Sequence, residues 1–176
     1  MHSILSHHGV TPDIGEGVHV HPSAEVIGEV RIGAQSSVWC KAVIRADVNH
    51  IHIGRGTNIQ DLSMLHVSHK SAADPLGAPL IIGDYVTVGH SVILHGCEIG
   101  NECLIGMGSI VMDKVVIEPR VLVGAGSLVP EGKRLESGFL YLGRPAKPIR
   151  RLNEAELSHF RYSADHYMRL AESYKA

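Results

Sequence analysis

Aliphatic residues recur every six positions along most of the chain, and this spacing is the strongest pattern in the sequence. The seventeen anchor residues are Val20, Val26, Ile32, Val38, Ile44, Ile53, Ile59, Leu65, Ile82, Val88, Leu94, Ile99, Ile105, Val111, Ile117, Val123 and Val129. A glycine often follows the anchor, and a small or β-branched residue usually stands four positions after it. Ordinary strand alternation has a period of two and does not explain this pattern.

A period of six predicts an all-β solenoid of short parallel strands. Three hexapeptides form one triangular coil, and successive coils stack at the usual strand spacing of about 4.8 Å. The anchor fills the interior, the small residue fits near a corner, and glycine supplies tight-turn dihedral angles. Coils are expected over about residues 18–135. They are interrupted by a three-residue insertion after Ile44 and by a polar, Pro- and Gly-containing loop over about 68–80.

Beyond Val129 the period stops, so residues 1–150 are expected to form the solenoid with a connecting loop over 136–151. A helix is predicted over 152–175, with Asn153 as N-cap and Glu156 completing a capping box. One face of this helix is apolar, formed by Leu157, Phe160, Ala164, Tyr167, Ala171 and Tyr174. We expect this face to pack against a flat side of the solenoid, because the opposite face is too mixed in charge for membrane binding.

Composition narrows the functional class. The chain has 176 residues, 44% hydrophobic and 19% charged, with a net charge of −2, which suits a single folded domain. No stripe of Lys and Arg points to nucleic acid or an anionic membrane, and no apolar run is long enough to span a bilayer. Neither a signal peptide nor a zinc-finger spacing of Cys40, Cys97 and Cys103 is present, so we expect a reducing, cytoplasmic setting.

Counting hexapeptides around the three faces places two histidines side by side. Val20 is assigned to the first face, which puts Leu65 on the second. If the 17 residues from Leu65 to Ile82 are one hexapeptide plus an eleven-residue loop, Leu94 also falls on the second face, one coil later. His66 and His95 then occupy the same outward position, with Cα atoms about 5 Å apart. Arg45 occupies that position one coil earlier. His90 falls on the preceding face, directly above Asp61.

Three neutral imidazoles with an open fourth position are the ligand set of a catalytic zinc ion. His66, His95 and His90 offer this set if chains meet face to face in a trimer, which would bring His90 of one chain toward the pair of another. Any one histidine on a solenoid surface would be an ordinary solvated residue; the joint spacing favours a metal site. The remaining histidines, His7 and His8 among them, are expected to be such ordinary residues.

Residues 45–66 and 86–97 resemble the signature of the γ-class carbonic anhydrases, which belong to the hexapeptide-repeat proteins. The resemblance extends over about residues 10–175. It implies a left-handed parallel β-helix with a C-terminal helix packed along it, and a homotrimer with three metal sites at the subunit interfaces. In this family His66 and His95 would come from one subunit and His90 from the next.

The resemblance also implies roles for the neighbouring polar residues. Arg45 and Asp47 resemble the pair that ties adjacent subunits together. Gln60 matches the residue that orients the metal-bound hydroxide, and Asn58 and Asp61 match polar residues that support the metal ligands.

The implied reaction is attack of metal-bound hydroxide on CO₂ to give bicarbonate, with Zn²⁺, Fe²⁺ or Co²⁺ as suitable ions. A proton must also leave, and here the chain departs from the best-understood branch of the family, which uses glutamates. This chain has Val48 at one of those places, and the loop after His66 has no glutamate. Because these glutamates are absent, we expect weak activity.

Two further residues each have two possible roles. His69 is either a proton relay or an exposed loop histidine, and Tyr167 either leans over the site or packs in the core.

Two other functions remain open. The segment Gly143–Lys147 resembles the turn after the solenoid in acyl-CoA and acyl-carrier-protein transferases, which use a histidine base without a metal. Such a transferase has no use for three converging imidazoles beside Gln60 and Asp61. The protein could also be a trimeric scaffold that keeps its metal only to hold the interface together.

Overall fold

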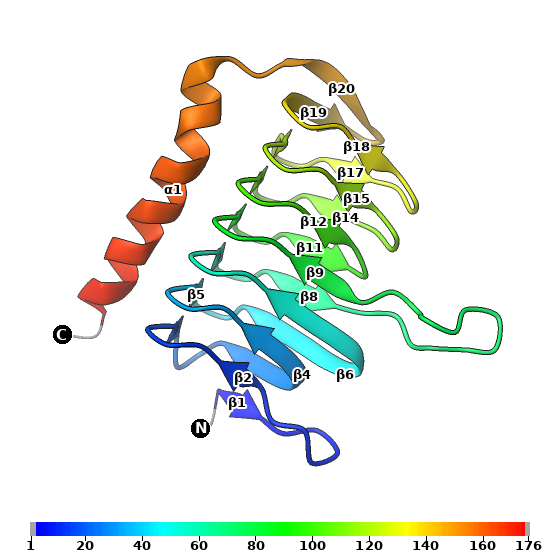
Figure 1. The fold of residues 1–176 in the computed structure, drawn as a ribbon, viewed down its shortest axis with the longest axis vertical. Helices are drawn as coiled ribbons and strands as arrows, with labels where there is room; N and C mark the ends of the chain where they lie inside the picture. Colours follow the sequence, from blue (N-terminus) through cyan, green and yellow to red (C-terminus); the bar gives the residue numbers. More distant parts are fainter. Residues whose placement is uncertain (1–2, 175–176) are drawn as a thin grey trace.

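The computed structural model describes residues 3–174, which form a parallel β-solenoid flanked by one long helix (Figure 1). The elements are β1 (Ile4–Leu5), β2 (Asp13–Ile14), β3 (His19–Val20), β4 (Glu25–Ile32), β5 (Ser37–Val38), β6 (Val43–Ile53), β7 (Asn58–Ile59), β8 (Met64–His66), β9 (Leu80–Ile82), β10 (Thr87–Val88), β11 (Ile93–His95), β12 (Glu98–Ile99), β13 (Leu104–Ile105), β14 (Ile110–Val111), β15 (Val116–Ile117), β16 (Leu122–Val123), β17 (Leu128–Val129), β18 (Arg134–Leu135), β19 (Phe139–Gly143), β20 (Ala146–Arg151) and α1 (Glu154–Ser173). The predicted fold class, a hexapeptide-repeat β-helix with a C-terminal helix along it, is confirmed.

The strands stack into three faces of a prism. The first face follows β3, β5, β7, β10, β13, β16, β19 and β20. The second runs from β1 through the start of β4 and β6 to β8, β11, β14 and β17. The third runs from β2 through the end of β4 and β6 to β9, β12, β15 and β18.

The interior is built from the anchors of the six-residue pattern. All of them except Val20 are buried, and each stands opposite an anchor of the next coil, as Leu65 does with Leu94. The small residues at the corners bond the coils together: the Ser63 hydroxyl donates to the Gly89 carbonyl and accepts from the Val92 amide. Stacking thus buries apolar surface that no single coil could bury alone.

The three-residue insertion does not break the ladder. Instead β6 runs continuously around the corner between the second and third faces, with an irregular register where it passes β4. Gly28 lies opposite Ala46 at this corner, and a Cβ atom on Gly28 would collide with the Ala46 carbonyl. The insertion thereby carries residues 47–49 outward, beside the second face.

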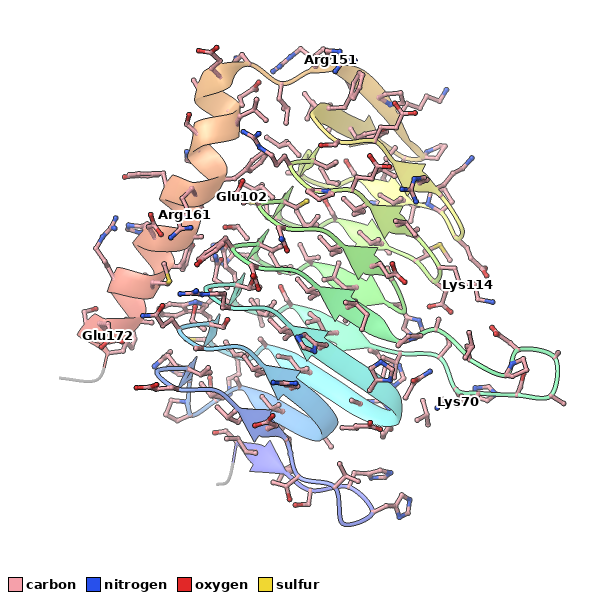
Figure 2. The ribbon with its side chains drawn as sticks, viewed as in Figure 1. Lys70, Glu102, Lys114, Arg151, Arg161 and Glu172 are labelled. Atoms are coloured by element: carbon pink, nitrogen blue, oxygen red, sulfur yellow. The ribbon has the colours of Figure 1, made fainter. Side chains whose placement is uncertain are left out.

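The predicted loop leaves the solenoid between β8 and β9 and extends beyond the prism, with Lys70 on it (Figure 2). Its two limbs meet in an isolated bridge between Ser68 and Ala78. The Asn49 side-chain amide donates to the carbonyls of Ser68 at 3.0 Å and Leu76 at 2.9 Å. The base of the loop is therefore fixed to the corner that the insertion creates.

Two sequence expectations about the ends of the solenoid are wrong. Residues 136–151 are not a connecting loop, because β19 continues the first face beside β16 and pairs antiparallel with β20. Tyr141 takes the interior position opposite Val123 and is only 6% exposed. Because this interior residue is aromatic, the aliphatic pattern did not reveal that the repeat continues here. At the other end, β1 and β2 pair with β4, so strands begin well before residue 18.

Helix α1 covers the first face, as its apolar stripe predicts. Asn153 caps it and exchanges hydrogen bonds with Glu156, which confirms the capping box. Phe160, Ala164 and Ala171 are buried along it, and α1 contacts β5, β7 and β10. Within residues 3–174, no helix combines the length and apolar character needed to cross a membrane.

Candidate metal centre

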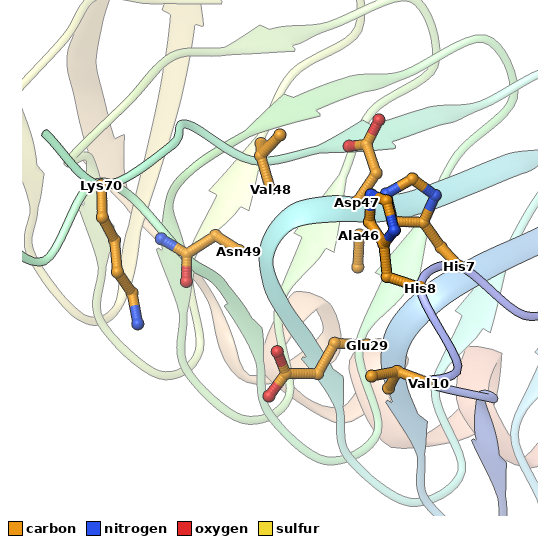
Figure 3. A pocket seen from close by; sticks show the side chains of 9 residues that line it. All are labelled: His7, His8, Val10, Glu29, Ala46, Asp47, Val48, Asn49 and Lys70. Atoms are coloured by element: carbon orange, nitrogen blue, oxygen red, sulfur yellow. The ribbon is translucent and has the colours of Figure 1, made fainter.

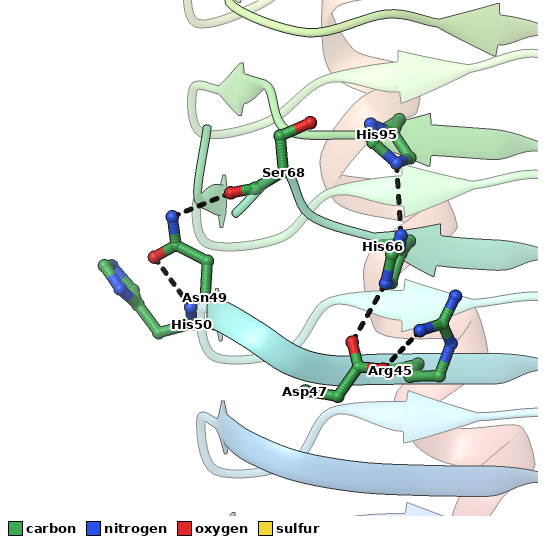
Figure 4. A network of polar contacts seen from close by, with 7 residues as sticks. All are labelled: Arg45, Asp47, Asn49, His50, His66, Ser68 and His95. Atoms are coloured by element: carbon green, nitrogen blue, oxygen red, sulfur yellow. Dashed lines mark hydrogen bonds and ion pairs between the residues drawn. The ribbon is translucent and has the colours of Figure 1, made fainter. Parts of the chain in front are cut away.

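His66 and His95 are neighbours on the second face, which confirms the face count. β8 and β11 pair in parallel register with His66 opposite His95. Their rings approach with His66 Nδ1 and His95 Nε2 3.1 Å apart (Figure 4). Two nitrogen ligands bound at about 2.0–2.1 Å in tetrahedral geometry lie about 3.3 Å apart. The pair is therefore spaced to bind one ion together.

Asp47 fixes the orientation of the His66 ring. Its carboxylate lies 3.0 Å from His66 Nε2 and also accepts a hydrogen bond from Arg45 of the same chain. Partial burial opposes ionisation of Asp47, but the hydrogen bonds from His66 and Arg45 outweigh it and lower its pKa to about 2. A carboxylate only accepts hydrogen bonds, so Nε2 carries the hydrogen and Nδ1 of the neutral ring faces His95 with a lone pair.

Asp113 orients the His95 ring in the same way, and the sequence analysis did not predict a role for Asp113. The His95 Nδ1 atom lies 2.5 Å from the Asp113 carboxylate, so Nε2 is left with its lone pair toward His66. Two neutral rings held this way present two lone pairs to each other at 3.1 Å, an arrangement that needs a cation between them. Either a shared proton or a metal ion fits. Leu94 pairs with Val111, so the face count puts Met112 level with His95 and Asp113 one residue further along, and it gave no direct signal for Asp113.

His90 lies at the edge of the first face, and its Nδ1 atom is 2.9 Å from Asp61. Each of the three predicted ligands thus has a carboxylate partner, the arrangement that orients metal-binding histidines in proteins. His90 is not part of the His66–His95 pair. Among residues 3–174 of one chain, no group of three or more His, Cys, Asp or Glu side chains is arranged to hold a metal ion.

Gln60 and Asn58 lie on the His90 side of the site. Gln60 is 5% exposed and donates to the Asn58 side chain at 3.1 Å, and Asn58 donates to the Thr87 hydroxyl at 3.0 Å. Thr87 in turn bonds Ser163 of α1 at 2.9 Å. This chain of bonds ties the Gln60 amide to the helix.

A cavity of about 420 Å³ lies between the first face and α1, and Gln60, His90 and Tyr167 all line it. Tyr167 also packs edge-on against Trp39, with ring centroids 5.7 Å apart. Burial and the nearby charge of Asp61 raise the pKa of Tyr167. Tyr167 therefore packs against Trp39, and it also borders the cavity that Gln60 and His90 line.

The structure leaves His69 apart from these residues. It is exposed on the loop, and within the described part of the chain its ring contacts none of the site residues. A smaller pocket of about 250 Å³ opens beside Asp47 and is lined by His7, His8, Glu29 and Lys70 among others (Figure 3). The His7 and His8 rings lie 4.1 Å apart. Because both precede the first repeat, the six-residue pattern gave no signal for their position.

Known proteins resemble this chain over nearly all of its length. A family model described as bacterial transferase hexapeptide (six repeats) matches residues 96–131. Protein YrdA of Escherichia coli (strain K12) is 54% identical, over 93% of this chain and 89% of YrdA. A carbonic anhydrase of Geobacillus kaustophilus is 42% identical, over 98% and 91% of the two chains.

Solved structures agree with the fold and with the family. A hexapeptide transferase family protein from Anaplasma phagocytophilum superimposes with a TM-score of 0.89 at 40% identity, and the match covers 97% of each chain. Sequence relatives named as γ-class carbonic anhydrases extend the likeness, among them an Arabidopsis thaliana mitochondrial protein that is 44% identical over 92% of this chain and 58% of its own length. The chain therefore belongs to the γ-carbonic-anhydrase-like family of hexapeptide-repeat proteins.

Proposed function

We propose that the protein is a metal-dependent carbonic anhydrase whose site is completed by a second copy of the chain. The observation that carries this proposal is the His66–His95 pair, in which two carboxylates turn both lone pairs toward one point. Relatives named as carbonic anhydrases support the choice of reaction. Zn²⁺, Fe²⁺ and Co²⁺ all suit imidazole ligands, and we propose a cytoplasmic location.

The second face supports the homotrimer. Its outward positions beside the histidine pair are apolar, namely Met64, Ile93, Ile110 and Leu128, and Ile93 is 41% exposed. The first face is covered by α1, whereas no element among residues 3–174 of the chain lies over this column. Burying it against another copy removes apolar surface from water and places His90, at the edge of the neighbouring face, where it becomes the third ligand.

His66, His95 and a histidine of a second copy would hold the ion, which would lower the pKa of a water molecule to about 7 and so supply hydroxide at neutral pH. Asp47, Asp113 and Asp61 keep the hydrogen of each histidine on the nitrogen that faces away from the ion. Because the Gln60 side-chain NH₂ donates to Asn58, its carbonyl oxygen is available to accept a hydrogen bond from water and so orient it. The outward side chains of Leu104, Met107 and Leu122 that line the cavity suit a small apolar substrate such as CO₂.

Proton export determines how fast the reaction can run. The proposed relay is His69, because imidazole is a common proton shuttle and the loop carries this side chain into solvent. A single exposed imidazole replaces the glutamates of the best-understood branch, so we expect slow turnover that responds to buffer.

Stopped-flow CO₂ hydration on protein of known metal content tests the proposal. Chains loaded in parallel with Zn²⁺ and Fe²⁺ are expected to hydrate CO₂ above background, and His95→Ala is expected to lose both metal and activity. One metal per chain without any hydration would contradict the reaction while leaving the metal site intact.

An acyltransferase is the second candidate, favoured by one observation. The Anaplasma phagocytophilum relative is described as a hexapeptide transferase family protein, and the apolar cavity beside His90 adjoins the first face. Acetyl-CoA binding measured by calorimetry separates the two functions. Micromolar binding that survives in His95→Ala would favour the transferase, whereas metal content without either activity would leave a trimeric scaffold.

A further inference from the structure

Asp113 joins two parts of the molecule that are far apart in the chain. One of its carboxylate oxygens lies 2.5 Å from His95 Nδ1, and the other accepts a hydrogen bond from the Ser68 hydroxyl at 2.6 Å. Ser68 begins the inserted loop two residues after His66. A single carboxylate therefore connects a proposed metal ligand with the base of the loop.

The residue next to Asp113 holds the same loop at a second point. Lys114 forms an ion pair with Asp74, with Nζ and Oδ2 2.5 Å apart. Both of these contacts come from the turn that follows β14, so this one turn holds the loop at its base and near its tip. In Figure 2 the Lys114 side chain stands on the prism edge from which the loop extends.

The backbone leaves room for this carboxylate. Gly96, directly after His95, has φ +52°, and a Cβ atom there would lie 2.5 Å from Asp113 Oδ1. A side chain at this position would therefore displace the carboxylate from His95. The glycine and the aspartate together form a built contact rather than a chance approach of two surface groups.

We propose that Asp113 is a positioning residue that couples metal binding at His95 to the order of the loop over residues 67–79. This inference rests on the proposed metal site. An ion on His95 Nε2 fixes the hydrogen on Nδ1 and the orientation of the ring, and the ring in turn fixes the Asp113 carboxylate to which Ser68 is bonded. Coupling of this kind is reciprocal, so breaking the Asp113–Ser68 bond also weakens metal binding.

Three variants separate the two sides of the contact. Asp113→Ala removes both bonds, Ser68→Ala removes only the bond to the loop, and Asp113→Asn keeps an acceptor for His95 without the charge. Lys114→Ala is the matched control, because it releases the loop from Asp74 without touching His95. The full chain is used throughout, with Co²⁺ as the probe, since its visible absorption reports both affinity and ligand geometry.

We expect Asp113→Ala to bind Co²⁺ about 10- to 100-fold more weakly than the native chain, with an altered visible spectrum, and Asp113→Asn to recover part of that loss. Ser68→Ala is expected to weaken Co²⁺ binding a few-fold. Hydrogen exchange of the loop amides supplies the second measurement. Co²⁺ is expected to slow exchange over residues 67–79 in the native chain and in Lys114→Ala, but not in Ser68→Ala.

Native Co²⁺ affinity in Asp113→Ala would overturn the proposal, as would loop exchange in the native chain that is the same with and without Co²⁺. Should Asp113→Ala fail to fold, Ser68→Ala and Asp113→Asn decide the matter by the same two measurements. Absence of Co²⁺ binding by the native chain would instead contradict the metal site itself, and the coupling with it.

Discussion

The first and second faces of the prism are built from the same repeat but differ in what covers them. On the first face, outward polar groups bond one another and α1, as in the series Gln60, Asn58, Thr87 and Ser163. On the second face, outward aliphatic residues flank the His66–His95 pair, and no element in the described part of the chain lies over them. Interior positions decide that the chain forms a solenoid, whereas outward positions decide what each face binds.

The largest expected effect, a loss of bound metal, comes from removing one of the proposed metal ligands. His95→Ala and His90→Ala are each expected to lose essentially all bound metal, although His90 lies on the other face, because each site would lose one of three ligands. Metal per chain, measured by plasma mass spectrometry, checks this. His52→Ala on the third face is the control. Full metal content in His90→Ala would contradict a site shared between chains.

Uncovering the first face tests the other half of the comparison. Phe160→Ala truncates the most deeply buried large side chain of α1 and leaves a cavity. It is expected to lower the free energy of unfolding by about 3–5 kcal/mol. Tyr162→Ala, on the solvent side of α1 with 61% of the residue exposed, is expected to change it by less than about 0.5 kcal/mol. Chemical denaturation measures both. Equal effects would show that α1 does not depend on its packing.

The border between the faces is tested at Gln60. Gln60→Ala is expected to keep its metal but to slow CO₂ hydration about 10- to 100-fold, because the amide no longer orients water. Gln35→Ala, at a corner remote from the cavity, serves as control. Unchanged hydration in Gln60→Ala would remove this residue from the mechanism.

The smallest expected effect concerns the start of α1. Hydrogen bonds from Arg150 and the Asn153 amide lower the pKa of Glu156 from 4.5 to about 2. A lowered pKa means that the ionised group stabilises the folded chain above pH 4.5 and that this contribution is lost as the pH falls toward 2. The acid-induced loss of stability is therefore expected to be shallower in Glu156→Gln than in the native chain. Thermal midpoints compared across this pH range check it, with Glu154→Gln as control.

The sequence predicted the β-helix, the insertion, the long loop and the capped helix because each depends on local spacing. It failed at Tyr141, where a large aromatic residue occupies an interior position that the aliphatic pattern could not reveal. It also failed at Asp113, which lies one residue beyond the position level with His95, so the face count did not single it out. His7 and His8 precede the repeat, so no register placed them beside Asp47.

By itself the sequence determined the register of His66 with His95, because a fixed period of six allows only one stacking of neighbouring coils. Only the tertiary structure decided which carboxylate orients each ring and which face α1 covers. Those contacts join the repeat to turns, insertions and a helix that lie outside it, and their geometry depends on side-chain packing rather than on spacing along the chain.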